Sequence, residues 1–272
     1  MPELPEVETT RRGIEPHLLN HTLIGAIVRQ SRLRWPVPRG LAKKIAGQTI
    51  HAVERRGKYL LLKLAQGTIM LHLGMSGSLR ITASDSPAEK HDHLDLQLDS
   101  GQCLRLRDPR RFGSLHWITE DDPLQHKLLK NLGPEPLSAD FDSEYLFKKS
   151  RKRKLAIKLF IMDSKIVVGA GNIYASEALF RAGIRPTRAA GRVSRAEYER
   201  LVVAIKEVLQ AAIRSGGTTL QDFTNSEGKP GYFKQQLHVY GRADEACHHC
   251  ETLIKHRIMG QRASYYCPHC QR

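Results

Sequence analysis

Four of the five cysteines stand near the C-terminus, and their spacing constrains what this part of the chain can fold into. Cys247 and Cys250 form one CxxC pair, sixteen residues (251–266) follow, and Cys267 and Cys270 form a second pair. Two such pairs at this separation are typical of a tetrahedral zinc site whose four positions are all occupied by thiolates. A closed site of this kind is structural, because no position is left for a catalytic water. We therefore predict one structural Zn²⁺ per chain.

Other arrangements of these residues are chemically open. The same four cysteines could form two disulfides, and His248, His249 and His269 stand between them as further nitrogen ligands. Disulfides are rare in the cytosol. The first eight residues contain three glutamates, where a secretory signal would carry positive charge followed by an apolar stretch. We therefore expect a cytoplasmic protein that binds zinc rather than one held by disulfides.

The charge of the chain indicates a polyanionic partner. Forty-three Lys and Arg against 28 Asp and Glu give a formal charge of +15, and residues 148–158 contain seven basic side chains and no acidic one. A charged run is often only a solvated face, but the total charge and the cysteine module both favour phosphate binding. The longest apolar runs, such as residues 59–62, are far shorter than the ~20 residues of a membrane span. Nucleic acid is therefore the expected partner.

The N-terminus offers a candidate nucleophile. Removal of Met1 would turn Pro2 into a free secondary amine, and α-amino groups titrate at about 7.7–8.0, so a useful fraction is neutral near pH 7. Attack of such an amine on a sugar C1′ gives an iminium directly, and the adjacent Glu3 could supply the proton for ring opening. Pro5 and Glu6 also suit the first turn of an ordinary helix, so these residues alone leave both interpretations open.

Short alternating and apolar runs predict β structure in the first half of the chain. Cys103 lies in one of these runs and is expected to be a core residue. Seven or eight strands within about a hundred residues favour a sandwich or a barrel-like pair of sheets. The predicted strands are Thr22–Arg29, Thr49–Glu54, Lys58–Leu64, Thr68–Leu73, Ser78–Thr82, His93–Leu98, Cys103–Arg107 and Ser114–Ile118.

Wider apolar spacing predicts helices at the N-terminus and after Asp122. The strongest helix pattern covers 194–214, where Ser194 is a suitable N-cap and two glycines follow the last apolar position. The segment 132–137, which contains two prolines and a glycine, is typical of a linker. The predicted helical segments are 5–20, 124–132, 143–163, 172–183 and 194–214.

Several separated motifs, taken together with the cysteine tail, resemble one known family. They cover residues 2–8 (PELPEVE), 56–59 (RGKY), 72–77 (HLGMSG), 91–93 (HDH), 108–113 (DPRRFG), 168–177 (VGAGNIYASE) and 228–232 (GKPGY). In this order and number they resemble the bacterial formamidopyrimidine-DNA glycosylases, which repair 8-oxoguanine and ring-opened purines. The resemblance extends over nearly the whole chain.

The resemblance implies an α+β fold with two domains. The N-terminal domain would be a β-sandwich with a flanking helix, and the C-terminal domain would be helical, with a helix-two-turns-helix element and a four-cysteine zinc-finger β-hairpin. The implied boundaries are 1–131 for the sandwich, 132–142 for a linker, 143–237 for the helical domain and 238–272 for the zinc finger.

The resemblance also implies catalytic roles for four residues. Pro2 would attack C1′, and Glu3 would protonate the opening deoxyribose ring. Lys58 would donate a proton and contact phosphate during β-elimination, where a cation stabilises developing negative charge. Arg262 would grip phosphate and assist the second elimination.

A base must leave the stack before an enzyme can act on it, and the gap must be filled. The family fills it with a methionine, an arginine and a phenylalanine, which match Met75, Arg110 and Phe112 here. His91, Arg153 and Asn172 match positions that contact DNA. Residues 217–232 match the loop that folds over the extruded base.

The implied function is excision of oxidised purines from double-stranded DNA, followed by β,δ-elimination at the abasic site. The partner would be duplex DNA that contains a damaged base, and the protein is expected to act as a monomer associated with the nucleoid. Two alternatives remain: the sister glycosylase for oxidised pyrimidines, and a zinc-ribbon DNA-binding protein without catalysis. Leu4 and the wedge set of Met75, Arg110 and Phe112 favour the purine enzyme, and a pure binder has no use for a free proline amine.

Overall fold

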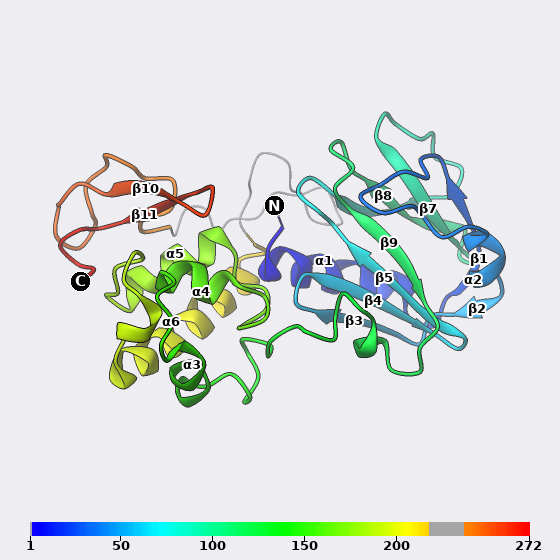
Figure 1. Cartoon of the computed structure of the whole chain (residues 1–272). Helices are drawn as coiled ribbons and strands as arrows, with labels where there is room; N and C mark the ends of the chain where they lie inside the picture. The colour runs from blue at the N-terminus through cyan, green and yellow to red at the C-terminus, as the bar shows by residue number, and fades with distance from the viewer. Residues whose placement is uncertain (1, 218–236) are drawn as a thin grey trace. The chain divides into compact units, whose positions relative to one another are not determined.

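The computed structural model describes residues 2–217 and 237–272, which belong to two compact units. The first unit contains residues up to Lys130 together with a segment that begins at Ser215, and it is built mainly of strands. The second unit spans Asn131–Arg214 and the C-terminal residues, and it consists of helices and one β-hairpin (Figure 1).

Helix α1 (Leu4–Leu18) follows Pro2 and Glu3 directly. Pro5 lies in its first turn, where a missing N–H costs nothing because the first amides of a helix have no partner within it. Val7, Ile14 and Leu18 form its buried stripe, and the helix packs on strands β3 and β4 of the first unit. This packing fixes the N-terminal residues on the sandwich.

Two antiparallel sheets make up the first unit. The five-stranded sheet has the order β2-β1-β7-β8-β6, and the four-stranded sheet has the order β3-β4-β5-β9. The strands are β1 (Thr22–Val28), β2 (Gln48–Thr49), β3 (Ala52–Arg56), β4 (Tyr59–Leu64), β5 (Gly67–His72), β6 (Ser78–Ala83), β7 (Asp92–Leu98), β8 (Gln102–Arg107) and β9 (Ser114–Ile118).

One apolar core joins the two sheets, α1 and the short helix α2 (Leu41–Ile45). Side chains such as Leu62 on β4, Leu96 on β7 and Ile14 on α1 belong to the same buried cluster. Their burial supplies the main driving force for this unit, at about 1.5–3 kcal/mol for each large aliphatic side chain. The predicted sandwich with a flanking helix is confirmed.

The second unit is helical and ends in a hairpin. Its elements are α3 (Ser143–Ser150), α4 (Ile157–Met162), α5 (Asn172–Arg181), the 3₁₀ turn η2 (Ala190–Arg192), α6 (Arg195–Arg214), β10 (Lys255–Met259) and β11 (Arg262–Tyr266). Helix α6 packs against α3 and α5. The α+β class and the hairpin predicted next to the cysteines are confirmed.

Three predicted elements differ from the structure. The helix expected over 143–163 is broken into α3 and α4, because Lys152 takes the left-handed conformation with φ 62°. The helix expected over 124–132 is wrong: only the 3₁₀ turn η1 (Pro123–Gln125) forms there. The predicted strand Thr49–Glu54 is interrupted where the Ile50 amide bonds the carbonyl of His21.

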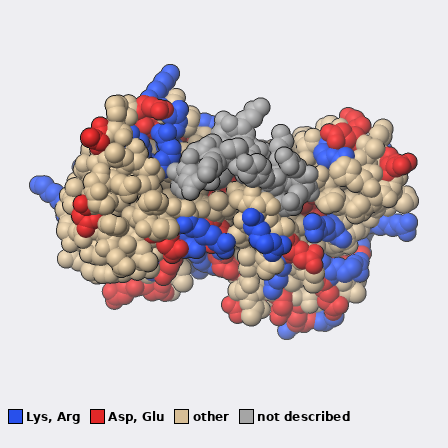
Figure 2. Space-filling view, turned by 180° about the vertical axis from the view of Figure 1, so that it is seen from behind, with Lys and Arg blue, Asp and Glu red and all other residues tan. Residues whose placement is uncertain are grey.

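Charged side chains of both signs are visible on the surface drawn in Figure 2, so the net positive charge does not make that whole face basic. Within residues 2–217 and 237–272, no helix combines the length and the apolar character that a membrane crossing requires.

Candidate active site and zinc centre

The candidate site residues fall into two sets, one on each unit. Within the first unit lie Pro2, Glu3, Lys58, Met75, His91, Arg110 and Phe112. Within the second lie Arg153, Asn172, Arg262 and the four cysteines.

The candidate nucleophile and acid lie at the start of α1. Pro2 is buried and Glu3 is only 3% exposed. The backbone N–H of Glu3 donates to Oε2 of Glu6 at 2.8 Å, and the carbonyl of Glu3 accepts from the amide of Val7. Glu3 therefore has a fixed backbone at the helix N-terminus. Met1 lies outside the described residues.

Lys58 stands on the turn between β3 and β4 and is half-buried. Gly57 before it has φ 58°, a left-handed conformation that glycine adopts without strain. The turn is supported by Arg55, whose Nη1 donates to the Gly57 carbonyl at 3.0 Å and whose Nε donates to Glu8 of α1 at 3.0 Å. One guanidinium thus connects the helix that carries Glu3 with the turn that carries Lys58.

His72 ends β5 opposite Tyr59, with ring centroids 4.8 Å apart. The pKa of His72 is lowered to about 4, mainly by burial, with smaller contributions from the positive charges of Lys58 and Arg34. Its Nδ1 accepts the backbone N–H of Gly74 at 3.0 Å, so the proton of the neutral ring is on Nε2. His72 is therefore a neutral histidine that supports the turn leading to Met75. Its place in the HLGMSG motif gave no indication of this supporting role.

The three proposed wedge residues are exposed and close to one another. Met75 is 38% exposed and Phe112 is 41% exposed, so both large apolar side chains present surface to solvent. The Arg110 guanidinium carbon lies 4.8 Å from the centre of the Phe112 ring. Gly74, beside Met75, packs directly on the backbone of Phe112. The structure therefore places the turn that carries the Met75 thioether against the segment that carries the Arg110 guanidinium and the Phe112 ring, although the two segments are distant in sequence.

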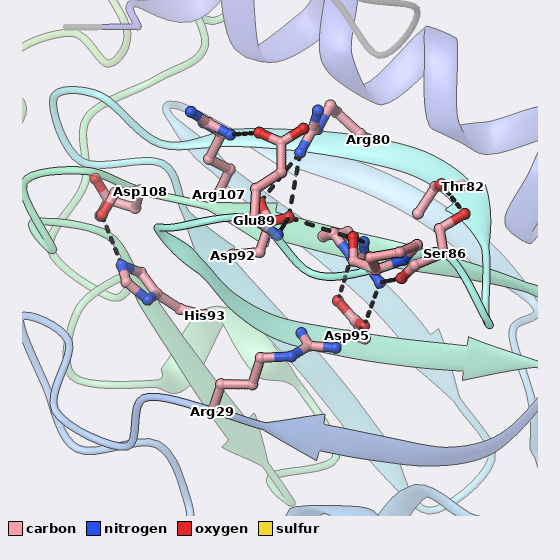
Figure 3. A network of polar contacts seen from close by, with 12 residues as sticks. Arg29, Arg80, Thr82, Ser86, Glu89, Asp92, His93, Asp95, Arg107 and Asp108 are labelled. Carbon is pink, nitrogen blue, oxygen red and sulfur yellow. Dashed lines mark hydrogen bonds and ion pairs between the residues drawn. The ribbon is translucent and has the colours of Figure 1, made fainter.

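His91 sits where the loop after β6 enters β7. It has the left-handed φ of 83°, and its carbonyl accepts the backbone N–H of Asp108 at 3.0 Å. The loop before it is closed by buried Arg105, which binds Asp95 through Nε and Nη2 at 2.9 Å and donates to the carbonyl of Pro87 at 3.1 Å. Figure 3 shows this network between Asp92, Asp95 and the surrounding arginines.

Asn172 opens helix α5 in the second unit and contacts the hairpin. Its Nδ2 donates to the carbonyl of Ala263 at 3.0 Å, directly beside Arg262. Arg262 is exposed and pairs with Met259 across the hairpin turn. Two candidate DNA contacts that are distant in sequence are therefore brought together within this unit.

Lys158 is a functional candidate that the sequence analysis missed. It is only 1% exposed, and its Nζ donates to Oδ1 of Asn172 at 2.6 Å and to Oγ of Ser264 at 2.7 Å. It stands at the end of a basic run whose other members suggested a solvated or phosphate-binding face. Its apolar neighbours on the helix, Ile157 and Phe160, were the only sequence signal of burial.

Arg153 is exposed on the turn between α3 and α4. Its backbone N–H bonds the Ser150 carbonyl at 2.9 Å, and its carbonyl accepts from the amide of Gly191 at 2.9 Å. A Cβ on Gly191 would lie 2.9 Å from the Arg153 carbonyl oxygen, so this close approach requires glycine. The backbone of Arg153 is fixed while its guanidinium faces solvent.

The four cysteines are gathered as zinc ligation requires. The Sγ atoms of Cys247, Cys250, Cys267 and Cys270 all lie within 4.8 Å of one another. Zn–S bonds of ~2.3 Å in a tetrahedron place sulfur atoms about 3.8 Å apart, which this cluster matches. The closest Sγ pair is 3.4 Å apart, well beyond the ~2.05 Å of a disulfide, and all five cysteines are free thiols. The donor set and its spacing therefore fit structural zinc.

The segment matched to the loop over the extruded base lies, except for Gly217, outside the described residues.

Within the described residues, the β-sandwich, the helical unit and the thiolate cluster on a hairpin define a two-unit zinc-finger protein of the α+β class. Family models match three consecutive parts of the chain: the formamidopyrimidine-DNA glycosylase N-terminal domain (1–115), its H2TH domain (132–224) and the zinc finger found in FPG and IleRS (244–272). The chain belongs to the formamidopyrimidine-DNA glycosylase family.

Full-length relatives agree with this assignment. The chain is 60% identical to the formamidopyrimidine-DNA glycosylase of Thioalkalivibrio sulfidiphilus and 59% identical to that of Nitrosococcus oceani, with complete coverage of both chains in each case.

Solved structures agree as well. The MutM (Fpg) protein of Thermus thermophilus gives a TM-score of 0.89 at 38% identity, covering 99% of this chain and 98% of that one. A Lactococcus lactis Fpg mutant in complex with Fapy-dG DNA gives 0.91 at 34% identity, with complete coverage of both chains.

Proposed function

We propose that this chain excises oxidised purines, 8-oxoguanine and formamidopyrimidines, from duplex DNA and then cleaves the strand at the abasic site by β,δ-elimination. The observation that carries this proposal is the match to formamidopyrimidine-DNA glycosylases along the entire chain. The Lactococcus lactis relatives were crystallised with Fapy-dG DNA and with DNA containing an abasic site, which are the substrates of the two steps.

The reaction begins at Pro2. Its secondary amine, once Met1 is removed, attacks C1′ of the damaged nucleotide, the bond to the base breaks, and an iminium forms between Pro2 and the opened sugar. Glu3 donates the proton that the ring oxygen takes up on opening. The position of Glu3 directly after Pro2 supports this role, because a general acid must lie within reach of the atom that it protonates.

Strand cleavage follows from the iminium. Loss of a proton from C2′ expels the 3′ phosphate, and a second elimination expels the 5′ phosphate. Lys58 donates a proton in the first elimination and Arg262 assists the second. Cations near departing phosphates stabilise the charge that develops on them.

The remaining residues bind and deform the duplex. Met75, Arg110 and Phe112 fill the space left by the extruded nucleotide, where thioether and ring replace stacking and the guanidinium offers donors to the orphaned base. His91, Arg153 and Asn172 contact phosphates. The four cysteines hold the zinc that folds the hairpin carrying Arg262. We further place the protein in the cytoplasm, associated with the nucleoid and monomeric.

Single-turnover assays on three duplexes test the proposal against the pyrimidine-specific alternative. The duplexes contain 8-oxoguanine opposite cytosine, 8-oxoguanine opposite adenine, and thymine glycol opposite adenine. We expect fastest excision from the first duplex and strand cleavage at the excised site. Preference for thymine glycol would favour the sister enzyme, and binding without excision would favour a non-catalytic DNA-binding protein.

A further inference from the structure

The two turns that carry the proposed wedge share one buried carboxylate. Met75 lies in the turn after β5, and Arg110 and Phe112 lie in the segment after β8. Asp108 has no exposed surface; its Oδ1 accepts the hydroxyl of Ser76 at 2.7 Å and its Oδ2 accepts the backbone N–H of Gly113 at 2.7 Å. The carboxylate of Asp108 therefore binds Ser76, which follows Met75, and Gly113, which follows Phe112, at the same time.

Ser76 makes a second bond that closes this connection. Its Oγ accepts the backbone N–H of Arg110 at 3.1 Å while its own proton goes to Asp108. Ser76 is only 5% exposed, so removing its hydroxyl would leave an acceptor and a donor without their partner inside the protein. The hydroxyl thus links the Met75 turn to the backbone of another wedge residue.

The backbones of the two turns are also in direct contact. A Cβ on Gly74 would lie 2.3 Å from the carbonyl carbon of Phe112, and Gly74 has φ 66°. A Cβ on Gly113 would lie 3.0 Å from both Oδ2 of Asp108 and the carbonyl oxygen of His72. Glycine is therefore required at Gly74, whereas a side chain at Gly113 would force its neighbours to shift by a few tenths of an ångström, so the two turns are tightly packed on each other.

The backbone of Asp108 is fixed as well. Its N–H donates to the carbonyl of His91 at 3.0 Å, and its carbonyl lies 2.8 Å from Nε2 of His93, which donates to it (Figure 3). Asp108 thus joins the Met75 turn, the Arg110–Phe112 segment and the start of β7, where His91 stands.

From this arrangement we propose that Ser76 and Asp108 are positioning residues that hold Met75, Arg110 and Phe112 as one preorganised wedge. This inference rests on the proposed function, because it assigns these residues to base extrusion. Wedge side chains that are ordered before DNA binds lose less conformational entropy on insertion. The two polar residues act only through the side chains that they position.

Ser76→Ala tests the proposal, with Ser78→Ala as a matched control because Ser78 is almost equally buried, at 6% exposure, two residues along the chain. We expect Ser76→Ala to slow single-turnover excision of 8-oxoguanine from duplex on the order of 10-fold. Elimination at a preformed abasic site should stay within about twofold, since no intact base must be extruded. Ser78→Ala should match the wild type in both assays.

A double-mutant cycle separates positioning from general destabilisation. In a Phe112→Ala background, Ser76→Ala should cause little further loss, because the wedge that it positions is already incomplete. In the DNA-free Ser76→Ala protein, amide hydrogen exchange should be faster than in the wild type, and it should rise in both 72–77 and 108–113. Asp108→Asn keeps an acceptor for Ser76 and should retain more excision activity than Asp108→Ala.

Two results would overturn the inference: unchanged excision in Ser76→Ala, or an equal loss with and without Phe112. Failure of the wild type to excise 8-oxoguanine would instead count against the proposed function. Even then, hydrogen exchange still tests whether Ser76 and Asp108 hold the two segments together. Increased exchange in only one of the segments 72–77 and 108–113 would refute that coupling.

Discussion

The backbone N–H of Glu3 donates to the carboxylate of Glu6 at 2.8 Å, and this bond closes the first turn of α1 next to Pro2. The Glu3 side chain in turn accepts from the backbone N–H of Glu6, so the two residues form a capping box. Glu3→Gln keeps an oxygen that can accept this bond, so the substitution should leave the helix start intact.

Glu3→Gln should abolish most base excision and spare most strand cleavage at preformed abasic sites. Loss of a general acid costs about 10²–10⁴-fold in rate, whereas an abasic sugar opens in solution to an aldehyde, which forms the iminium with Pro2 without a proton from Glu3 to the ring oxygen. Single-turnover rates on an 8-oxoguanine duplex and on an abasic duplex measure the two steps. An equal loss on both substrates would contradict this division of roles.

His72 should make stability depend on pH. Its pKa is about 4 in the folded protein, below the value of about 6.5 in an unfolded chain, so the unfolded state binds more protons between these values. Its contribution is complete above about pH 6.5 and is lost as the pH falls towards 4, with a slope of at most about 1.4 kcal/mol per pH unit. Protonation of Nδ1 also breaks the bond to Gly74.

The variant His72→Asn keeps an acceptor for the Gly74 amide and does not titrate. Its midpoint of thermal unfolding should fall less between pH 7 and pH 5 than that of the wild type. His116, whose pKa is also lowered to about 4 by burial, should account for part of the remaining slope. An identical pH dependence in wild type and His72→Asn would refute the assignment.

Zinc should be required for the hairpin and not for the sandwich. Metal analysis should return one zinc per chain. Cys250→Ser should lower zinc content and DNA affinity while near-native β-sheet circular dichroism remains, because the core of the first unit is separate from the thiolate cluster. Cys103→Ser is the control: Cys103 is buried in β8, and its replacement should leave the zinc content unchanged.

Arg110 should determine the opposite-base preference. Its donors match O2 and N3 of cytosine, whereas adenine presents a different edge, and a good bidentate contact discriminates by about 1–3 kcal/mol. Wild type should excise 8-oxoguanine faster opposite cytosine than opposite adenine, and Arg110→Ala should reduce that ratio. A preference that survives the substitution would assign discrimination to another residue.

Short sequence patterns correctly predicted the features that depend on neighbouring residues, namely the thiolate cluster and the strands. The CxxC pairs indicated the thiolate cluster because ligand spacing is set by metal geometry, and period-two alternation located the strands. Local patterns failed between Ser143 and Asp163, where the left-handed Lys152 ends one helix, and after Pro123, where a helix pattern stops after one 3₁₀ turn.

Polar contacts between residues far apart in the chain could not be predicted from the sequence. Nothing in the residues around Ser76 indicates that its hydroxyl meets Asp108, thirty-two positions later. Lys158 similarly looked like one more member of a basic run, and only tertiary structure places its ammonium against Asn172 and Ser264. The family resemblance selected the candidate site residues, while the structure identified which side chains hold them in place.

The central claim is that Pro2 is the nucleophile, and borohydride trapping tests it most directly. Reduction of the iminium during reaction with an 8-oxoguanine duplex should give a stable covalent protein–DNA adduct. Peptide mass spectrometry should locate that adduct at Pro2, on a chain that lacks Met1. An adduct located at Lys58, or the same yield from a chain that retains Met1, would contradict the account.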